Sequence, residues 1–228
     1  MILGRFLKPA KMAGFGRRGQ TSENILVHSY LFDLGELCMK QARTLDEREF
    51  RRVLDHIASR SHAARNRAML LMTFYGGFRV GEVAQLRMAD VFDVEGKVKP
   101  EIQLDGERVK NKHARTVFLS DRLRKELSLY RTSLKVLGDQ LPLFPTQKSP
   151  ERGFTPNTAA QHFSSIYKAA GLVGATSHSG RRTFITRLAN KGVGVRLLAS
   201  LAGHRSITTT QRYIDVNDDM ARAAVELI

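Results

Sequence analysis

The sequence predicts a mainly α-helical fold with one small antiparallel β-sheet, an α+β architecture. Apolar residues recur at helical spacing in most segments after residue 44, and helix-start and helix-stop signals bound these segments. Alternating strand-like patterns occur only around residues 91–119. Among the 228 residues Cys38 is the only cysteine, which excludes an intramolecular disulfide and a cysteine zinc cluster.

The first 43 residues differ in composition from the rest of the chain. Residues 1–20 are glycine-rich and basic and contain no acidic residue, which predicts a flexible arm. Residues 22–41 are apolar enough to form one helix that packs on a partner surface. We therefore predict two parts, with the arm and this helix over 1–43 and a compact domain over 44–228.

Three helices are predicted at the start of the domain. Thr44 and Glu47 have the spacing of a capping box, which places the first helix start at Thr44. Gly76 and Gly77 can adopt backbone conformations closed to other residues, so they end the second helix. The predicted helices cover residues 44–57, 63–75 and 80–86.

The middle of the domain is predicted to contain the β-structure. Residues 91–97 have the pattern of a strand. Residues 102–104 and 116–119 have the pattern of two hairpin arms, joined across the turn at 106–113.

The second half of the domain is predicted to be helical. Thr155 as N-cap and Pro156 at the first helical position begin one helix, and Gly171 ends it. Gly192 and Gly203 end two later helices. The predicted helices cover residues 121–137, 155–170, 177–190, 195–201, 206–214 and 217–227.

The net charge of +15 indicates a polyanionic partner, most commonly a nucleic acid. The acidic end, residues 211–228, is instead expected to pack on protein. In the basic arm the expected contacts to DNA phosphates are Arg5, Lys8, Lys11, Arg17 and Arg18.

Sequence patterns also argue against several other classes of protein. No apolar run approaches the roughly 18 residues of a membrane helix, and no signal peptide is evident, so we expect a cytoplasmic protein without a membrane partner. Neither H-E-x-x-H nor the phosphate-binding G-x-x-x-x-G-K-[ST] occurs, so neither a metal nor a nucleotide cofactor is expected.

Several polar residues are of the types needed to break a phosphodiester without a metal. A tyrosine can attack phosphorus and keep the bond energy in an ester. Arginines can grip two phosphate oxygens, a lysine can protonate the leaving oxygen, and histidines can donate to the phosphate or relay protons. The candidates are Tyr213, Arg79, Arg181, Lys110 or Lys112, His178 and His204.

The order of these residues resembles the tyrosine recombinases of the phage integrase family. T-F-Y-G-G-F-R-V-G-E resembles the family's first arginine motif and assigns Arg79, with Glu82 as the supporting acid. V-K-N-K-H-A-R-T-V-F-L resembles the hairpin that carries the lysine, and counting back from its strand favours Lys110 over Lys112. H-S-G-R, L-A-G-H and the tyrosine nine residues later assign His178, Arg181, His204 and Tyr213.

Each candidate also has a purely structural interpretation. Arg79 can cap a helix, Lys110 can be a solvated turn residue, and Tyr213 can be a core aromatic. Arg182 follows Arg181 directly, and about 100° apart on a helix the two cannot face one phosphate, so Arg182 is expected to contact the DNA backbone or solvent. Lys112 is likewise expected to contact DNA.

The resemblance implies site-specific cutting and rejoining of double-stranded DNA through a 3′-phosphotyrosine, without metal or ATP. It also implies a homotetramer on two DNA sites in the nucleoid, accessory DNA-bending proteins, and a C-terminal exchange helix over 217–227. With only 43 residues before Thr44, the chain resembles short recombinases that consist mainly of the catalytic domain. The alternatives are an inactive DNA-binding accessory protein, an integrase remnant, or a type IB topoisomerase.

Overall fold

The computed structural model describes residues 42–106, 114–213, 222, 225 and 226. The arm and helix predicted over 1–41, the hairpin turn with Lys110 and Lys112, and most of the helix predicted over 217–227 lie outside these residues. Contacts group Ala42–Ile228 into one compact unit, and the described residues all belong to it.

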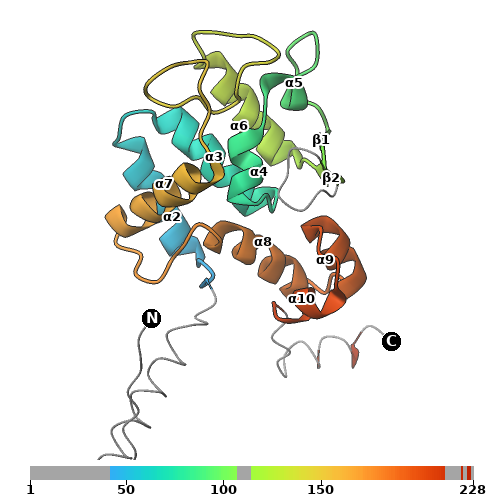
Figure 1. Ribbon diagram of the computed structural model, residues 1–228. Helices are drawn as coiled ribbons and strands as arrows, with labels where there is room; N and C mark the ends of the chain where they lie inside the picture. The colour runs from blue at the N-terminus through green and yellow to red at the C-terminus, as the bar shows by residue number, and fades with distance from the viewer. Residues whose placement is uncertain (1–41, 107–113, 214–221, 223–224, 227–228) are drawn as a thin grey trace, which may run out of the picture. The chain divides into compact units, whose positions relative to one another are not determined.

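The described part is mainly helical with a two-stranded antiparallel sheet, as predicted (Figure 1). β1 pairs with β2 in a register that sets Glu101 opposite Phe118 and Leu104 opposite Arg115. The elements are α2 (Glu47–Ala58), α3 (Ala63–Tyr75), α4 (Val80–Gln85), α5 (Met88–Val91), β1 (Glu101–Leu104), β2 (Arg115–Phe118), α6 (Asp121–Thr132), α7 (Pro156–Ala169), α8 (Ser179–Asn190), α9 (Val195–Ala202) and α10 (Ile207–Gln211).

The first helix has its N-cap at Asp46, two residues after Thr44, and begins at Glu47. The capping box is formed by Asp46 and Glu49, whose carboxylates accept from the backbone N–H groups of Glu49 at 2.8 Å and Asp46 at 3.2 Å, respectively. Thr44 and Glu47 have the same spacing, but the Asp46 carboxylate is the acceptor that meets the free N–H groups of the first turn.

The strand predicted over residues 91–97 is wrong. Val91 ends the short helix α5, and only Phe92 pairs with Val98, as an isolated bridge. The carboxylate of Asp93 accepts from the backbone N–H groups of Glu95 at 3.0 Å and Lys97 at 2.8 Å. An aspartate that captures nearby backbone donors favours a turn over a strand ladder, which explains the difference.

Other helix boundaries differ from the prediction by two to five residues. α6 ends at Thr132 rather than at residue 137. Just after this end, the Ser133 hydroxyl donates to the Tyr130 carbonyl at 2.6 Å. α8 begins at Ser179 rather than Ser177. α3 and the Thr155–Pro156 start of α7 agree with the prediction. Gly77, predicted to end α3, has a left-handed backbone with φ of +63°.

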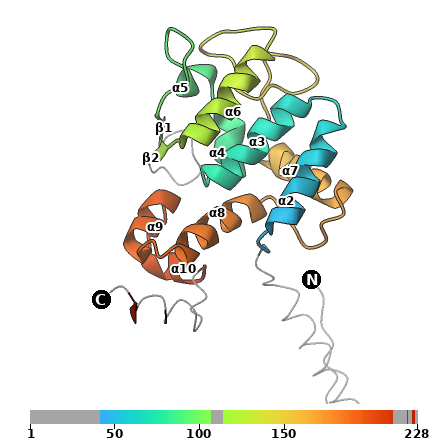
Figure 2. The same cartoon turned by 180° about the vertical axis from the view of Figure 1, so that it is seen from behind.

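One apolar cluster forms the core, and its fully buried members run from Leu45 to Leu172. Phe50 and Phe74 stack at its centre with ring centroids 3.6 Å apart. The helices α8, α9 and α10 lie outside this cluster and are grouped at one end of the domain in both views (Figures 1 and 2). α8 approaches α3 so closely that a Cβ on Gly180 would stand 2.2 Å from the Thr73 hydroxyl.

Candidate active site

A central cleft of about 1020 Å³ opens where the core meets α8, α9 and α10. Its walls come from the start of α4, from β2, from the start of α7, from the turn before α8, and from the segment between α9 and α10. Segments far apart in the sequence therefore share one cavity. The charged and imidazole side chains that line it are Arg79, Glu82, Arg115, His178, His204 and Arg205.

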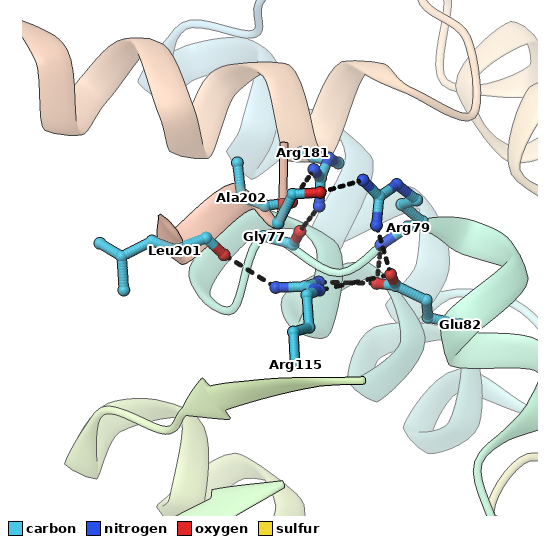
Figure 3. A network of polar contacts seen from close by, with 8 residues as sticks. Gly77, Arg79, Glu82, Arg115, Arg181, Leu201 and Ala202 are labelled. Carbon is cyan, nitrogen blue, oxygen red and sulfur yellow. Dashed lines mark hydrogen bonds and ion pairs between the residues drawn. The ribbon is translucent and has the colours of Figure 1, made fainter. Parts of the chain in front are cut away.

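Glu82 lines this cleft and binds two arginines (Figure 3). Its side chain is buried, with 4% exposed, and accepts from the Arg79 guanidinium at 2.7 Å and the Arg79 backbone N–H at 2.8 Å. Arg115 donates to the same carboxylate through Nη2 at 2.7 Å and Nε at 3.4 Å. One carboxylate thus fixes the orientation of two guanidinium groups.

The environment keeps Glu82 ionised. Burial alone raises the pKa of its carboxyl, but the hydrogen bond and charge of Arg115, together with those of Arg79, outweigh burial and hold the pKa below its usual range. The negative charge of Glu82 is therefore present at neutral pH.

Replacing Glu82 with glutamine is expected to lower the free energy of unfolding by about 3–5 kcal/mol, because it leaves two guanidinium groups without their carboxylate. Because the folded pKa of Glu82 is lowered, its contribution is complete above the ordinary value of 4.5 and is lost as pH falls through the folded pKa. Urea unfolding at several pH values measures this effect. The free energy of unfolding of wild type should fall at acidic pH through this term, and that of Glu82→Gln should lack this part of the fall.

Glu126→Gln is the matched control for that measurement. Glu126 also pairs with an arginine, Arg67 at 2.6 Å, but both side chains are partly exposed. Exposed pairs contribute at most about 1 kcal/mol. Equal losses in the two variants would contradict a special role for the buried carboxylate.

Three arginines bind the C-terminal end of α9, where successive carbonyls lack helical partners. Arg115 donates to the Leu201 carbonyl at 2.8 Å, Arg181 to that of Ala202, and Arg79 to that of Gly203 at 2.9 Å (Figure 3). Positive side chains at this end are also favoured by the helix dipole.

Gly203 is required at this position for two reasons. Its backbone is left-handed, with φ of +61°, a conformation that glycine adopts without strain at a helix C-terminus. A Cβ at Gly203 would also stand 2.4 Å from Cδ of Arg115. The glycine of the L-A-G-H segment therefore leaves room for the Arg115 side chain.

Arg181 is buried at 5% exposure, and no carboxylate hydrogen-bonds to it among the described residues. Its guanidinium donates to the carbonyls of Gly77, at 2.5 Å, and Ala202. Burial, followed by the charges of Arg79 and Arg115, lowers its pKa to about 9, so it stays charged at neutral pH. Such a cation is suited to an incoming anion.

Two imidazoles beside these arginines are held neutral at pH 7. Burial is the largest cause for both, and it lowers the pKa of His178 with help from Arg181 and Arg79. The pKa of His204 falls to about 4 by burial and by the charges of the same two arginines and Arg115. Neutral imidazoles retain one N–H donor and one acceptor nitrogen.

Tyr213 lies directly after α10, against His204. The two rings are 5.6 Å apart with an interplanar angle of 24°, and the Arg182 guanidinium lies 5.1 Å above the tyrosine ring. Tyr130 and Tyr167 belong to the apolar core, whereas Tyr213 does not. The structure thus places Arg182 against the tyrosine.

The structure brings five of the six candidate catalytic residues into one region. Arg79, His178 and His204 line the central cleft, Arg181 binds the carbonyls behind it, and Tyr213 stacks on His204. Lys110, Lys112 and the arm residues Arg5, Lys8, Lys11, Arg17 and Arg18 lie outside the described residues.

Sequence reasoning did not single out Arg115, although it joins Glu82 to α9. A signal was available, because Arg115 shares one face of its strand with the buried Val117. An arginine on the inward face of a strand needs a buried acceptor.

The described part of the chain offers no metal centre and no membrane-spanning helix. It holds no group of three or more histidine, cysteine, aspartate and glutamate side chains close enough to bind a metal ion. None of its helices is both long and apolar enough to cross a membrane.

Solved structures with a similar fold include recombinases. The chain is similar to a crystal structure of XerA recombinase, at 27% identity and a TM-score of 0.64, over 83% of this chain and 66% of that one. It is also similar to XerH site-specific recombinase bound to difH substrate in a pre-cleavage complex, at 25% identity and a TM-score of 0.58, over 82% and 54%.

Sequence comparisons place the chain in a family. The model of the phage integrase family matches residues 43–220, and the chain belongs to that family. Relatives include tyrosine recombinase XerC of Myxococcus xanthus, 29% identical over 67% of this chain and 50% of its own length, and XerA of Pyrococcus horikoshii, 29% identical over 75% and 57%. The chain therefore spans about half the length of these curated relatives.

Proposed function

We propose that the protein is a site-specific DNA recombinase that cuts and rejoins strands through a 3′-phosphotyrosine. The observation that carries this proposal is the convergence of two arginines, two neutral imidazoles and Tyr213 around one cleft. Membership of the phage integrase family supports it. The XerH structure with difH substrate supports DNA as the ligand.

The proposed reaction begins with attack of the Tyr213 oxygen on the phosphorus of a DNA phosphodiester. The phenolic proton passes to a neutral imidazole, for which His178 is our candidate. The bond from phosphorus to the 5′ oxygen breaks, and Lys110 protonates that oxygen. A 5′-hydroxyl of a second strand then attacks the phosphotyrosine, and Tyr213 leaves and regains its proton.

Arg79 and Arg181 stabilise the negative charge that grows on the phosphoryl oxygens. A guanidinium has five N–H donors, and each of these side chains uses only two of them within the described residues. The remaining donors are held in a fixed orientation by protein contacts made before DNA binds. Preorganised donors of this kind are worth about 3–4 kcal/mol each in the transition state.

His204 donates a hydrogen bond to the same phosphate in this proposal. Its Nδ1 lies 2.9 Å from the hydroxyl of the buried Thr210. When that hydroxyl donates to Nδ1, the neutral ring carries its proton on Nε2, where it can reach a phosphate oxygen. In this proposal Thr210 positions the imidazole and, by donating to Nδ1, selects its tautomer.

Thr210→Val is expected to lower the rate of strand cleavage about tenfold, because the hydroxyl that selects the tautomer is lost while the side-chain size is kept. Single-turnover cleavage at saturating protein measures this rate. Thr208→Val is the matched control, since Thr208 is exposed in the same helix, and a melting curve checks the fold of both. Equal rates in a folded Thr210→Val and in wild type would contradict the assignment.

The remaining parts of the proposal concern assembly and location. We propose a tetramer on two DNA sites in the nucleoid, with residues 217–227 docking on a neighbouring protomer and DNA-bending proteins as accessories. The basic arm and Lys112 would contact DNA phosphates. Arg182 is expected to contact DNA only if it leaves the Tyr213 ring, over which it now lies.

A nicked duplex that releases the 5′ fragment after cleavage tests the function. The duplex should carry the inverted repeats or attachment sites found in the DNA that flanks the gene. We expect wild-type protein to form a covalent adduct that resists detergent. Binding without any adduct would favour an accessory protein, and relaxation of plasmids without sequence preference would favour a type IB topoisomerase.

A further inference from the structure

A second pocket, of about 320 Å³, lies across the start of α7 from the central cleft. Pro156 and Ala160 of α7 line the cleft, whereas Thr155, Thr158 and His162 line this second pocket. The two cavities are thus separated by one helix, which is about 10 Å thick.

Arg65 of α3 lines the second pocket and is a buried cation without a carboxylate partner among the described residues. It is 5% exposed, and burial lowers the pKa of its guanidinium. Nε and Nη2 donate to the Asn66 side-chain oxygen at 3.2 and 3.1 Å, and Nη1 donates to the Pro145 carbonyl at 2.8 Å. Three of its five donors are used by these neutral acceptors. The Phe154 ring, 5.1 Å from Cζ of Arg65, is also a neutral partner, so the guanidinium has no counter-charge among these contacts and the pocket favours an anion.

The rest of the pocket is also suited to an anion. Lys148 and Arg152 add positive charge, and no acidic side chain lines the pocket within the described residues. Glu151, in the same loop, is exposed and is not part of the lining. The buried hydroxyl of Thr146 has no hydrogen-bond partner in the described part of the chain. The N-terminus of α7 adds the positive end of a helix dipole.

Asn66, which binds Arg65, and His162, which lines the pocket, supply no negative charge. Because two guanidinium donors point at the Asn66 oxygen, that atom is an acceptor, and Nε2 of His162 at 3.0 Å must donate to it. Arg181 has the same pattern as Arg65, being buried and bound by neutral oxygens beside a basic cavity.

We propose that the second pocket binds a phosphate group of the DNA backbone, next to the segment held in the central cleft. This inference rests on the proposed function for the source of the phosphate. Arg65, Arg152 and Lys148 hold the phosphate oxygens, and Thr146 donates its hydroxyl. The pocket takes no part in bond breaking and fixes where the duplex lies.

Asn66→Asp tests this assignment because it keeps the side-chain shape and places a carboxylate against Arg65. At pH 8, where His162 is neutral, the variant is expected to melt at a higher temperature than wild type. Its affinity for a duplex of about 30 base pairs should fall roughly tenfold, the loss of one charge-assisted contact. The slope of log affinity against log salt should fall by about 0.9, the value for one phosphate.

Lys135→Gln is the charge-matched control, since it changes the net charge by the same amount at an exposed site away from the pocket. Its salt slope should equal that of wild type. If Asn66→Asp also keeps the wild-type affinity and slope, the proposal is overturned. An affinity loss of the same size in both variants would overturn it too, because net charge alone would then explain the effect.

Inorganic phosphate separates the two sources of the ligand. Melting of wild type and Asn66→Asp is measured with increasing phosphate, since a bound ion raises the melting temperature. Stabilisation of wild type alone, with unchanged DNA binding by the variant, would make this a site for free phosphate and overturn the DNA assignment. Adduct formation by wild type is scored separately, so an inactive protein whose salt slope still depends on residue 66 would refute the proposed function and leave the pocket in place.

Discussion

Replacing Tyr213 with phenylalanine is expected to abolish the covalent adduct on a nicked duplex while DNA affinity stays close to wild type. The phenyl ring keeps the stacking on His204 and the contact with Arg182, but it lacks the oxygen that we propose as the nucleophile. Adduct is measured by gel electrophoresis in detergent after incubation at saturating protein. A separate binding assay shows whether the variant still reaches the DNA.

Tyr75→Phe is the matched control for this loss. The Tyr75 hydroxyl is buried and has no hydrogen-bond partner among the described residues, so its removal should cost little stability. This variant should form adduct at the wild-type level. An adduct that persists in Tyr213→Phe would assign the nucleophile to another residue.

Replacing Arg181 with lysine is expected to lower the single-turnover rate of adduct formation by about 10²–10³-fold. The substitution keeps a positive charge, but an ammonium group cannot bind two carbonyls and also grip two phosphate oxygens in one plane. The carbonyls of Gly77 and Ala202 would lose donors as well, so some loss of stability is expected. Because the protein is at saturating concentration, the measured rate of adduct formation does not depend on DNA affinity.

Arg187→Lys provides the comparison on the same helix. Arg187 is half exposed, pairs with Glu47 at 3.3 Å and lies 5.2 Å from the centroid of the Phe74 ring. Its rate should stay within about twofold of wild type, since exposed pairs contribute little. A rate for Arg181→Lys within the same range would rule out the proposed contact with the transition state.

Local signals predicted much of the fold. The helix α3 and the start of α7 agree with the prediction because glycine and an N-cap followed by proline act on neighbouring residues. The strand over 91–97 was wrong because one side chain, Asp93, rearranges the backbone without changing the apolar pattern. Patterns of apolar residues carry no information on side chains that accept hydrogen bonds from nearby backbone N–H groups.

The candidate site was predicted by motif, one residue at a time. Arg79, His178 and His204 stand in recognisable segments, and the structure brings them to one cleft. Arg115 was not identified because its partners lie 33 and 86 residues away, at Glu82 and Leu201. Contacts of that range depend on how the whole chain packs, which no local pattern states.

The contacts between the core and the end of α9 have a consequence for the order in which parts of the protein fold during synthesis. The apolar cluster is complete once Leu172 has been added, but Arg79 must wait for Gly203, 124 residues after it. Gly203 follows Leu172 by 31 residues (203 − 172), which at about 5–20 residues per second takes roughly 2–6 s on the ribosome. A nascent chain can therefore settle its interior first, and Arg79 and Arg181 receive their final orientation only when the last helices arrive.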